Sequence, residues 1–124
     1  MLDDKKAVAT IAVKDARAAK KFYEGVLGLR PDGPERPGVL TYKSGGAPLF
    51  VYESKFAGTN KATSATWAFD DVEKEVETLK KKGVKFEHYD FPEMTRKGDV
   101  HVSGDMKAAW FKDPDGNILA LVSG

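Results

Sequence analysis

The sequence predicts an α+β fold in which two βαβββ units form a curved, mixed sheet of about eight strands around a cleft, with the helices on its convex face. Short apolar runs of strand length alternate with two amphipathic helical segments. Asp15 and Asp71 each follow an apolar run and open a helix, and their separation of 56 residues indicates an internal duplication. The length of 124 residues predicts a single domain over residues 1–124, with units at about residues 5–56 and 62–124.

In the first unit, a strand is expected in the apolar run AVATIAV, residues 7–13. A helix follows, because Asp15 can cap its first turn and apolar side chains then recur on one face. These side chains are Ala16, Ala19, Phe22, Tyr23 and Val26. The glycine- and proline-rich segment 28–38 ends the helix, and the runs VLTYK (39–43) and LFVYES (49–54) predict two further strands.

The second unit repeats this order. The run ATWAF, residues 65–69, predicts its first strand, and Asp70 or Asp71 can cap a helix that ends at Gly83 behind three lysines. The inner face of that helix consists of Val72, Val76 and Leu79. The run VKFEHY, residues 84–89, predicts another strand, and the apolar runs AAWF and ILALV predict a closing hairpin.

The segment FKDPDGN, residues 111–117, joins these last two runs and allows two interpretations. Its oxygen-bearing side chains stand at alternate positions, as in a calcium loop: Asp113, Asp115 and Asn117. Such a loop needs glycine at its sixth position and glutamate at its twelfth, where this chain has Ile118 and Gly124. Pro114 and Gly116 suit a tight turn. A hairpin turn is therefore predicted here in place of a metal site.

Charge and composition argue against several classes of function. Twenty basic and nineteen acidic side chains leave a net charge of +1, which provides no electrostatic footprint for nucleic acid or an acidic membrane surface. The absence of cysteine removes disulfides, thiolate nucleophiles and zinc–thiolate sites. No apolar run reaches the ~20 residues of a membrane span, and residues 1–8 lack the apolar core of a signal peptide. We expect a cytoplasmic protein that binds neither nucleic acid nor membrane.

Two motifs of the chain resemble those of the vicinal oxygen chelate superfamily, which includes glyoxalase I, extradiol dioxygenases, fosfomycin-resistance enzymes and bleomycin-binding proteins. They are VATIAVKDARAAKKFYEGVLGL, residues 8–29, and AAWFKDPDGNILALV, residues 108–122. The resemblance covers essentially the whole chain and implies the βαβββ architecture. It leaves the function open, because the fold hosts both metal enzymes and metal-free binders.

The resemblance also implies where a divalent metal would be held. Enzymes of this superfamily use His, Gln or Glu side chains that point from strands into the cleft, and the corresponding positions here are Val8, Ala65 and Ala120. Aliphatic side chains have no lone pair to donate to a metal. A register shift of one residue offers no good ligand either, since it gives Ala9, Ser64, Thr66, Leu119 or Leu121. Neither a metal nor a cofactor is therefore expected.

Other side chains are candidates for metal binding or acid–base chemistry. Glu53 is the only carboxylate of its strand and is expected to be a solvated residue at the strand end. His88 and His101 have no nearby cysteine, and surface or hydrogen-bonding roles are expected for them. Together with Asp105, these three residues are the candidates for general acid–base catalysis.

The cleft is expected to be apolar and suited to a flat or amphipathic molecule. Alternation along the first strand places Thr10 on the cleft face. Aromatic side chains of other strands either flank the missing metal site or belong to the core. Residues 88–107 are expected to form a long loop that acts as a binding lid and supplies polar contacts. The predicted ligand-binding residues are Thr10, Phe50, Tyr52, Trp67, Arg96, His101 and Trp110.

Two functions are compatible with this pattern. The first is metal-independent binding of a small, partly apolar molecule in the cleft, in the manner of a drug-sequestering protein. The alternative is a lyase, isomerase or dioxygenase of the same superfamily that uses a displaced metal or acid–base residues. A regulatory or partner-binding module leaves no sequence trace that separates it from the first function. The resemblance further implies a homodimer, and the segment 53–66 between the units permits either a compact return or an extended crossover.

Overall fold

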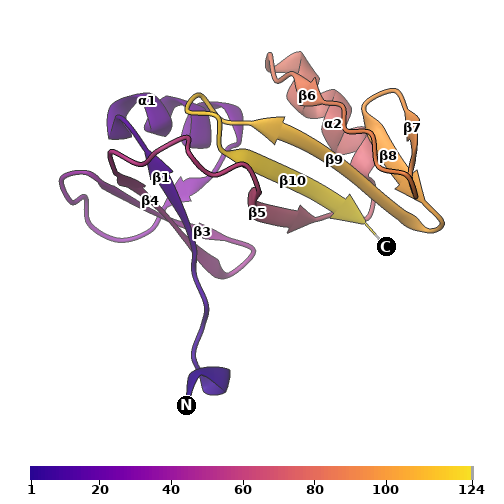
Figure 1. Cartoon of the computed structure of the whole chain (residues 1–124). Coiled ribbons are helices and arrows are strands. Elements are labelled where there is room, and N and C mark those ends of the chain that lie inside the picture. The colour runs from indigo at the N-terminus through magenta and orange to yellow at the C-terminus, as the bar shows by residue number, and fades with distance from the viewer. Residues whose placement is uncertain (124) are drawn as a thin grey trace.

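The computed structural model describes residues 1–123 and confirms the α+β class (Figure 1). Within these residues ten strands fall into two sheets, whereas the sequence suggested one sheet of about eight. The first sheet holds, in order, β1 (Ala9–Val13), β4 (Ala47–Glu53), β3 (Val39–Ser44) and β2 (Arg30–Pro31). The second holds β5 (Thr63–Ala68), β10 (Ile118–Ser123), β9 (Met106–Lys112), β8 (Val100–Ser103) and β7 (Thr95–Lys97), and β6 (Phe86–Glu87) pairs with β9.

The two sheets repeat one strand order. β1 pairs in parallel with β4, as β5 does with β10, and the remaining neighbours in both sheets are antiparallel. Figure 1 shows the sheets lying side by side, with β1 and β5 at their adjoining edges. Each half begins with the strand and helix that the sequence suggested. Three strands follow the helix of the first half, as expected, whereas five follow that of the second half among the described residues.

The helical elements are short. A 3₁₀ turn, η1 (Leu2–Asp4), lies at the end of an extended N-terminal segment that stands away from the sheets (Figure 1). Helix α1 (Ala16–Lys20) continues into a π-helical stretch, η2 (Lys21–Val26), and α2 (Val72–Lys81) follows β5. Among the described residues, no helix has the length and apolar character needed to cross a membrane.

Carboxylates fix the start of both main helices. Asp15 accepts a hydrogen bond from the backbone N–H of Arg17, and Asp71 accepts one from that of Lys74. Because such N-cap contacts satisfy backbone donors that the helix leaves free, they set where each helix begins. The predicted cap at Asp15 is confirmed, and of the two candidates for the second helix Asp71 is the cap.

Alternation along the strands gives each sheet two faces. On the side of the helices, which we call the helix face, side chains from both sheets form one buried cluster. Its members include Ile11, Val13, Val51, Tyr23, Val76, Phe111, Leu119 and Leu121. The opposite side, which we call the open face, carries the alternate residues of each strand. A ligand that reaches the strands without displacing a helix has to contact the open face.

The turn between β9 and β10 is the predicted hairpin. The backbone N–H of Asp113 donates to the carbonyl of Asn117 at 2.9 Å, and that of Gly116 donates to the carbonyl of Asp113 at 3.0 Å. The side chains of this turn also reach the first half of the chain, because Asp113 accepts a hydrogen bond from the Tyr23 hydroxyl and Asn117 Nδ2 donates to the carbonyl of Ala12. The turn thus connects the two halves.

Residues 88–107 differ from the long loop that the sequence suggested. They contain the antiparallel pair β7 and β8, and Gly98 and Gly104 adopt positive φ at the turns after β7 and after β8. β7 (TRK) is short and carries two charged residues, and β8 (VHVS) has only two apolar residues, so neither has the apolar run that marks a strand in the sequence. The strand expected at residues 84–89 is correspondingly reduced to β6.

The segment between the halves makes a compact return. The backbone N–H of Ser54 donates to the carbonyl of Val13, and Ala57 is buried. Gly58 lies directly against the carbonyl oxygen of Asp115. The sequence left a compact return and an extended crossover open, and these contacts select the compact return within one chain.

Candidate functional site

The open face of the first sheet brings three of the predicted ligand-binding residues together. Thr10 on β1 lies opposite Phe50 on β4, and Tyr52 follows Phe50 on the same face. Phe50 and Tyr52 keep 37% and 39% of their surfaces exposed, whereas Val51 between them is fully buried in the core. Two large aromatic side chains that share one exposed strand face offer a stacking surface for a flat molecule.

The open face of the second sheet carries an aromatic cluster, formed by Tyr89, Phe91, His101 and Trp110. The ring centroids of His101 and Trp110 are 4.9 Å apart, and the rings of Tyr89 and Phe91 lie 5.4 and 5.5 Å from that of Trp110. The segment after β6 therefore covers β8 and β9 on this face. His101 is 1% exposed beneath it, whereas Phe91 is 41% exposed.

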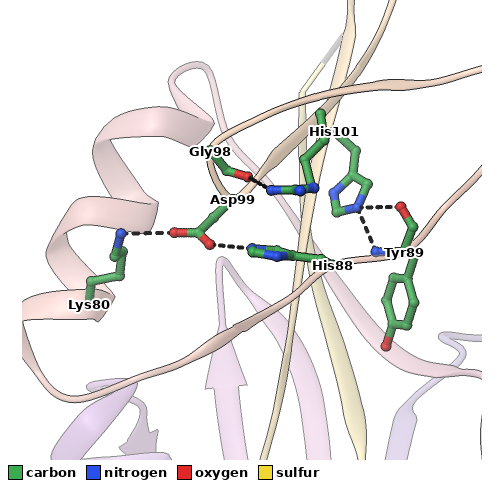
Figure 2. Close-up of polar contacts among 7 residues, drawn as sticks. Lys80, His88, Tyr89, Gly98, Asp99 and His101 are labelled. Carbon is green, nitrogen blue, oxygen red and sulfur yellow. Dashed lines mark hydrogen bonds and ion pairs between the residues drawn. The ribbon is translucent and has the colours of Figure 1, made fainter.

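Two polar atoms of the aromatic cluster are buried without a hydrogen-bond partner among the described residues. His101 Nε2 lies 3.0 Å from the backbone nitrogen of Tyr89, from which it accepts when unprotonated, and 3.2 Å from the Tyr89 carbonyl oxygen, to which it donates when protonated (Figure 2). Among residues 1–123, the two atoms without a partner are His101 Nδ1 and the Tyr89 hydroxyl. Burial raises the pKa of the Tyr89 hydroxyl and so keeps it protonated. Buried polar atoms of this kind normally contact water or a ligand.

An ion-pair network lies next to the aromatic cluster and holds the β7–β8 hairpin. Asp99 accepts hydrogen bonds from Lys80 Nζ at 2.9 Å and from His88 Nε2 at 2.7 Å (Figure 2). Lys80, and after it His88, holds the pKa of Asp99 below its usual value. Arg96 lies opposite His101 on β7, but its guanidinium donates to the carbonyl of Gly98. His88 and Arg96 thus each have a partner within this region.

Trp67 lies on the helix face, away from the other predicted ligand-binding residues. It pairs in register with Leu121, packs against the buried cluster, and donates its indole N–H to Ser44 Oγ at 3.0 Å. The spacing from Asp71 pointed to Ala65, which is itself a core residue, so the predicted register was wrong by one residue. A shift of one residue exchanges the two faces of a strand, and the open face of β5 carries Ser64 and Thr66 instead.

The positions at which the family resemblance implied a metal do not fit one. Ala120 lies on the open face and Val8 lies just before β1, and the corrected register adds only the hydroxyls of Ser64 and Thr66. Glu53 caps α1 by accepting a hydrogen bond from the N–H of Ala16 at 2.9 Å. Within residues 1–123, no three His, Cys, Asp or Glu side chains lie close enough to hold one ion. This donor set does not suit a divalent metal.

The candidates for acid–base chemistry do not form one group. Glu53 belongs to the first sheet and serves α1. His88 and His101 have different partners, the first Asp99 and the second the backbone of Tyr89. Asp105 is exposed in the turn between β8 and β9. His101 Nδ1 is the one unused ring nitrogen of these residues that lies inside the aromatic cluster.

Tyr89 and Phe91 belong to the lid expected at residues 88–107, but they were not among the individual ligand-binding residues predicted from the sequence. They became part of the site because the chain after β6 crosses β8 and β9 on the open face. The sequence carries one signal for this arrangement: HYDF, residues 88–91, places three ring side chains close together before Pro92. This signal does not show on which face of the sheet the rings pack, because β8, on which they pack, has no clear strand pattern in the sequence.

Comparison with known proteins places this fold in context. Residues 7–121 match the model of the Glyoxalase/Bleomycin resistance protein/Dioxygenase superfamily. A genomically encoded fosfomycin resistance protein from Listeria monocytogenes is 15% identical, with a TM-score of 0.69 over 95% of this chain and 91% of that one. A lactoylglutathione lyase from Agrobacterium tumefaciens is 16% identical, with a TM-score of 0.71 over 98% and 94%.

A third similar structure is an integron cassette protein from the mobile metagenome of a Halifax Harbour sewage outfall. It is 18% identical, with a TM-score of 0.69 over 98% of this chain and 99% of that one. No curated protein sequence matches the chain. At these identities the structural similarity concerns the fold, and the function has to be argued from the residues of the site.

Proposed function

The chain belongs to the glyoxalase/bleomycin resistance protein/dioxygenase superfamily, and from this membership we propose that it binds a small, partly apolar molecule on its open faces without a metal ion. The observation that carries the proposal is the exposed pair Phe50 and Tyr52, next to Thr10 on the same face. Aromatic rings there and in the aromatic cluster give stacking surfaces. Aliphatic side chains, and in the corrected register of β5 the hydroxyls of Ser64 and Thr66, stand where the family's metal ligands are expected.

Polar contacts for such a ligand are available in the aromatic cluster. His101 Nδ1 and the Tyr89 hydroxyl lack partners among the described residues, so a ligand with an acceptor group could satisfy a buried donor there. Phe91 is partly exposed, and its ring packs against those of His101 and Tyr89. Ligand entry would therefore require the segment that carries Phe91 to move outward, and the polar contacts would fix the orientation of an otherwise apolar ligand.

We further propose a cytoplasmic homodimer as the working form. The absence of cysteine supports a reducing compartment. A second copy would cover the exposed rings of the open faces, and burial between two chains would make each site deeper and drier than in one chain.

The probe N-phenyl-1-naphthylamine, a flat, uncharged fluorophore, tests the proposed site. Its fluorescence should increase on binding, and the double variant Phe50→Ala, Tyr52→Ala should bind it about tenfold more weakly, because two stacking rings are lost. Phe56→Ala is the matched control, since Phe56 is 64% exposed on the segment between the halves. Equal affinity in all three proteins would contradict the open-face site.

Metal independence needs its own measurement. Nickel, zinc and manganese ions should neither bind with a stoichiometry of one per chain nor change the affinity for the fluorophore, because the donor set on the open face does not suit them. Tight binding of one equivalent of any of these ions would overturn this part of the proposal.

The enzymatic alternative, a lyase, isomerase or dioxygenase, depends on His101. Its Nδ1 can act as a general base only in the tautomer that carries the ring proton on Nε2, where Nε2 donates to the Tyr89 carbonyl at 3.2 Å. Turnover of methylglyoxal hemithioacetal or of a catechol, abolished in a His101→Ala variant that still folds, would place this alternative first.

A further inference from the structure

A hollow of about 360 Å³ lies on the helix face, on the opposite side of the sheets from the proposed open-face site. We call it the helix-side pocket. The first half of the chain contributes Leu27 and Leu29 after η2, and the second half contributes Trp67 on β5 and Leu79 on α2. Its volume is at the small end of the ~300–1,000 Å³ typical of ligand sites. It is thus large enough for a small aromatic molecule.

The walls of the helix-side pocket are mainly apolar. Phe111 and Leu121 at its base are 1% and 2% exposed, and the partly buried rings of Trp67 and Phe69 line it as well. The indole N–H of Trp67 is already bonded to Ser44 Oγ, so the ring offers its π surface and not a hydrogen bond. A ligand here would gain most of its affinity from burying an apolar body against these side chains.

One charged side chain, that of Glu75, lines the pocket. Glu75 is half-buried on α2, and within residues 1–123 its carboxylate takes part in no ion pair or side-chain hydrogen bond. Glu73 on the same helix is exposed and pairs with Lys107 Nζ at 2.6 Å. The chain therefore neutralises a nearby exposed carboxylate but leaves the one at the pocket without a cation.

The position of Glu75 is not explained by the needs of the helix. A carboxylate in the first turn favours the helix dipole, but an exposed position there serves equally well. Glu75 instead lies four residues before Leu79, on the side of α2 that faces the core. A partly buried carboxylate loses part of its water, and a cation or hydrogen-bond donor that reaches it replaces that interaction.

We propose that the helix-side pocket binds a small amphipathic cation, with an aromatic or branched aliphatic body and one ammonium group. The body would pack between Leu27, Leu79 and Phe111, and the ammonium group would pair with Glu75. The face of Trp67 is available for a cation–π contact with the same group. This site is separate from the open-face site, since the two lie on opposite sides of the sheets.

Three probes with similar bodies and different charges test the class of ligand: 2-phenylethylamine, 2-phenylethanol and 3-phenylpropionate. The emission of Trp67 reports binding in a Trp110→Phe background, where Trp67 is the sole remaining tryptophan. The amine should bind about tenfold more tightly than the alcohol, and the carboxylate should bind more weakly than both, because Glu75 attracts a cation and repels an anion. Equal affinities for the amine and the carboxylate would overturn the proposal.

The variant Glu75→Gln tests the role of the carboxylate. It should reduce the affinity for the amine about tenfold and leave that for the alcohol unchanged. Glu77→Gln is the matched control, because Glu77 lies on the same helix but is exposed and does not line the pocket. Unchanged amine binding in Glu75→Gln, or no binding of the amine at millimolar concentration to either protein, would contradict the site.

A second pair of variants separates this site from the open face. Phe50→Ala, Tyr52→Ala should leave amine binding unchanged, and Glu75→Gln should leave binding of N-phenyl-1-naphthylamine unchanged. If the open-face variant also abolishes amine binding, the amine occupies the open-face site and the helix-side proposal is wrong.

Discussion

At the scale of single residues, Asp113 is the side chain that joins the two halves most directly. Its carboxylate accepts hydrogen bonds from the Tyr23 hydroxyl at 2.7 Å, from Asn117 Nδ2 at 2.8 Å, and from the backbone N–H groups of Asp115 and Asn117. Asp113 is only 5% exposed, and a buried carboxylate is tolerated when hydrogen bonds replace its water. The side chains that stand at the spacing of a calcium loop in the sequence therefore form hydrogen bonds that connect the two halves.

We expect Tyr23→Phe to lower the free energy of unfolding by about 1.5–3 kcal/mol, because it removes a buried hydrogen bond to a charged group. Urea denaturation measures this change. Tyr52→Phe is the control, since the Tyr52 side chain is 39% exposed on the open face, and its effect should be close to zero. Equal stability of Tyr23→Phe and the wild type would show that the Tyr23–Asp113 contact does not hold the halves together.

Stability should also decrease above about pH 10, the ordinary pKa of an unfolded tyrosine. Burial, and after it the charge of Asp113, raises the pKa of Tyr23, and burial with the Glu24 hydrogen bond raises that of Tyr42. Above pH 10 the unfolded chain releases these protons and the folded chain keeps them, so rising pH favours unfolding. Denaturation between pH 9 and 11 should show that the free energy of unfolding decreases less steeply with pH in Tyr23→Phe than in the wild type. Parallel pH profiles would contradict the assignment to Tyr23.

At the scale of elements, the two halves use the same device to start a helix after a strand. Asp15 and Asp71 both cap a helix, and in both halves the strand before the cap has alternate residues in the core, Ile11 in β1 and Trp67 in β5. This repetition supports the duplication that the sequence suggested. The same repetition explains the register error at Ala65. Ala65 lies as far before the cap Asp71 as Ala9 lies before the cap Asp15, and Ala9 packs against the core and not on the open face.

The cap of α2 gives a direct prediction at this scale. Asp71→Ala should destabilise the protein by about 1 kcal/mol, because the backbone N–H of Lys74 loses its acceptor. Asp70→Ala, one residue earlier and exposed, should change the stability by less than about 0.5 kcal/mol. Thermal or urea denaturation of the two variants measures the difference. A larger effect at Asp70 would mean that the helix begins one residue earlier.

The segment between the halves depends on a glycine. Gly58 has φ +78°, and an added Cβ would meet the carbonyl oxygen of Asp115. Gly33 has φ +89° and open space around it, so Gly33→Ala measures the cost of the backbone conformation alone. Gly58→Ala should be less stable than Gly33→Ala by about 1–3 kcal/mol, because it adds overpacking to the same strain. Similar stabilities of the two variants would show that the segment around Gly58 can move away from the Asp115 carbonyl without loss of free energy of unfolding.

At the scale of the whole molecule, much apolar surface remains exposed for a single chain. Phe50, Tyr52 and Met106 are each more than a third exposed, and Met1 and Leu2 on the projecting N-terminal segment are 98% and 84% exposed. Both sheets also end in short edge strands, β2 and β7. Exposed edges and apolar surfaces are commonly covered by a second chain.

We therefore predict a dimer of about twice 13.6 kDa in light scattering at micromolar concentration. Because the open faces carry the exposed rings, Phe50→Ala, Tyr52→Ala should weaken the dimer, whereas Phe56→Ala should not if the dimer forms there. A single species of 13.6 kDa would contradict the prediction.

The sequence by itself determined the class of fold, the opening strand and helix of each half, the caps at Asp15 and at Asp70 or Asp71, and the tight turn at residues 111–117. Each of these depends on local chemistry: a capping carboxylate, a run of apolar residues, or a proline and a glycine in a turn. Alternation also predicted the face of the sheet on which Thr10, Phe50 and Tyr52 lie, because the bounds of their strands were recognisable in the sequence.

Only the tertiary structure decided the division into two sheets, the face on which Trp67 lies, and the aromatic cluster around His101. The face of Trp67 depends on the register of β5 against β10, and a shift of one residue exchanges core and surface. The aromatic cluster forms because the chain after β6 crosses strands far along the sequence. The helix-side pocket combines side chains from both halves. Such contacts depend on how distant segments pack, and local sequence patterns carry no record of that packing.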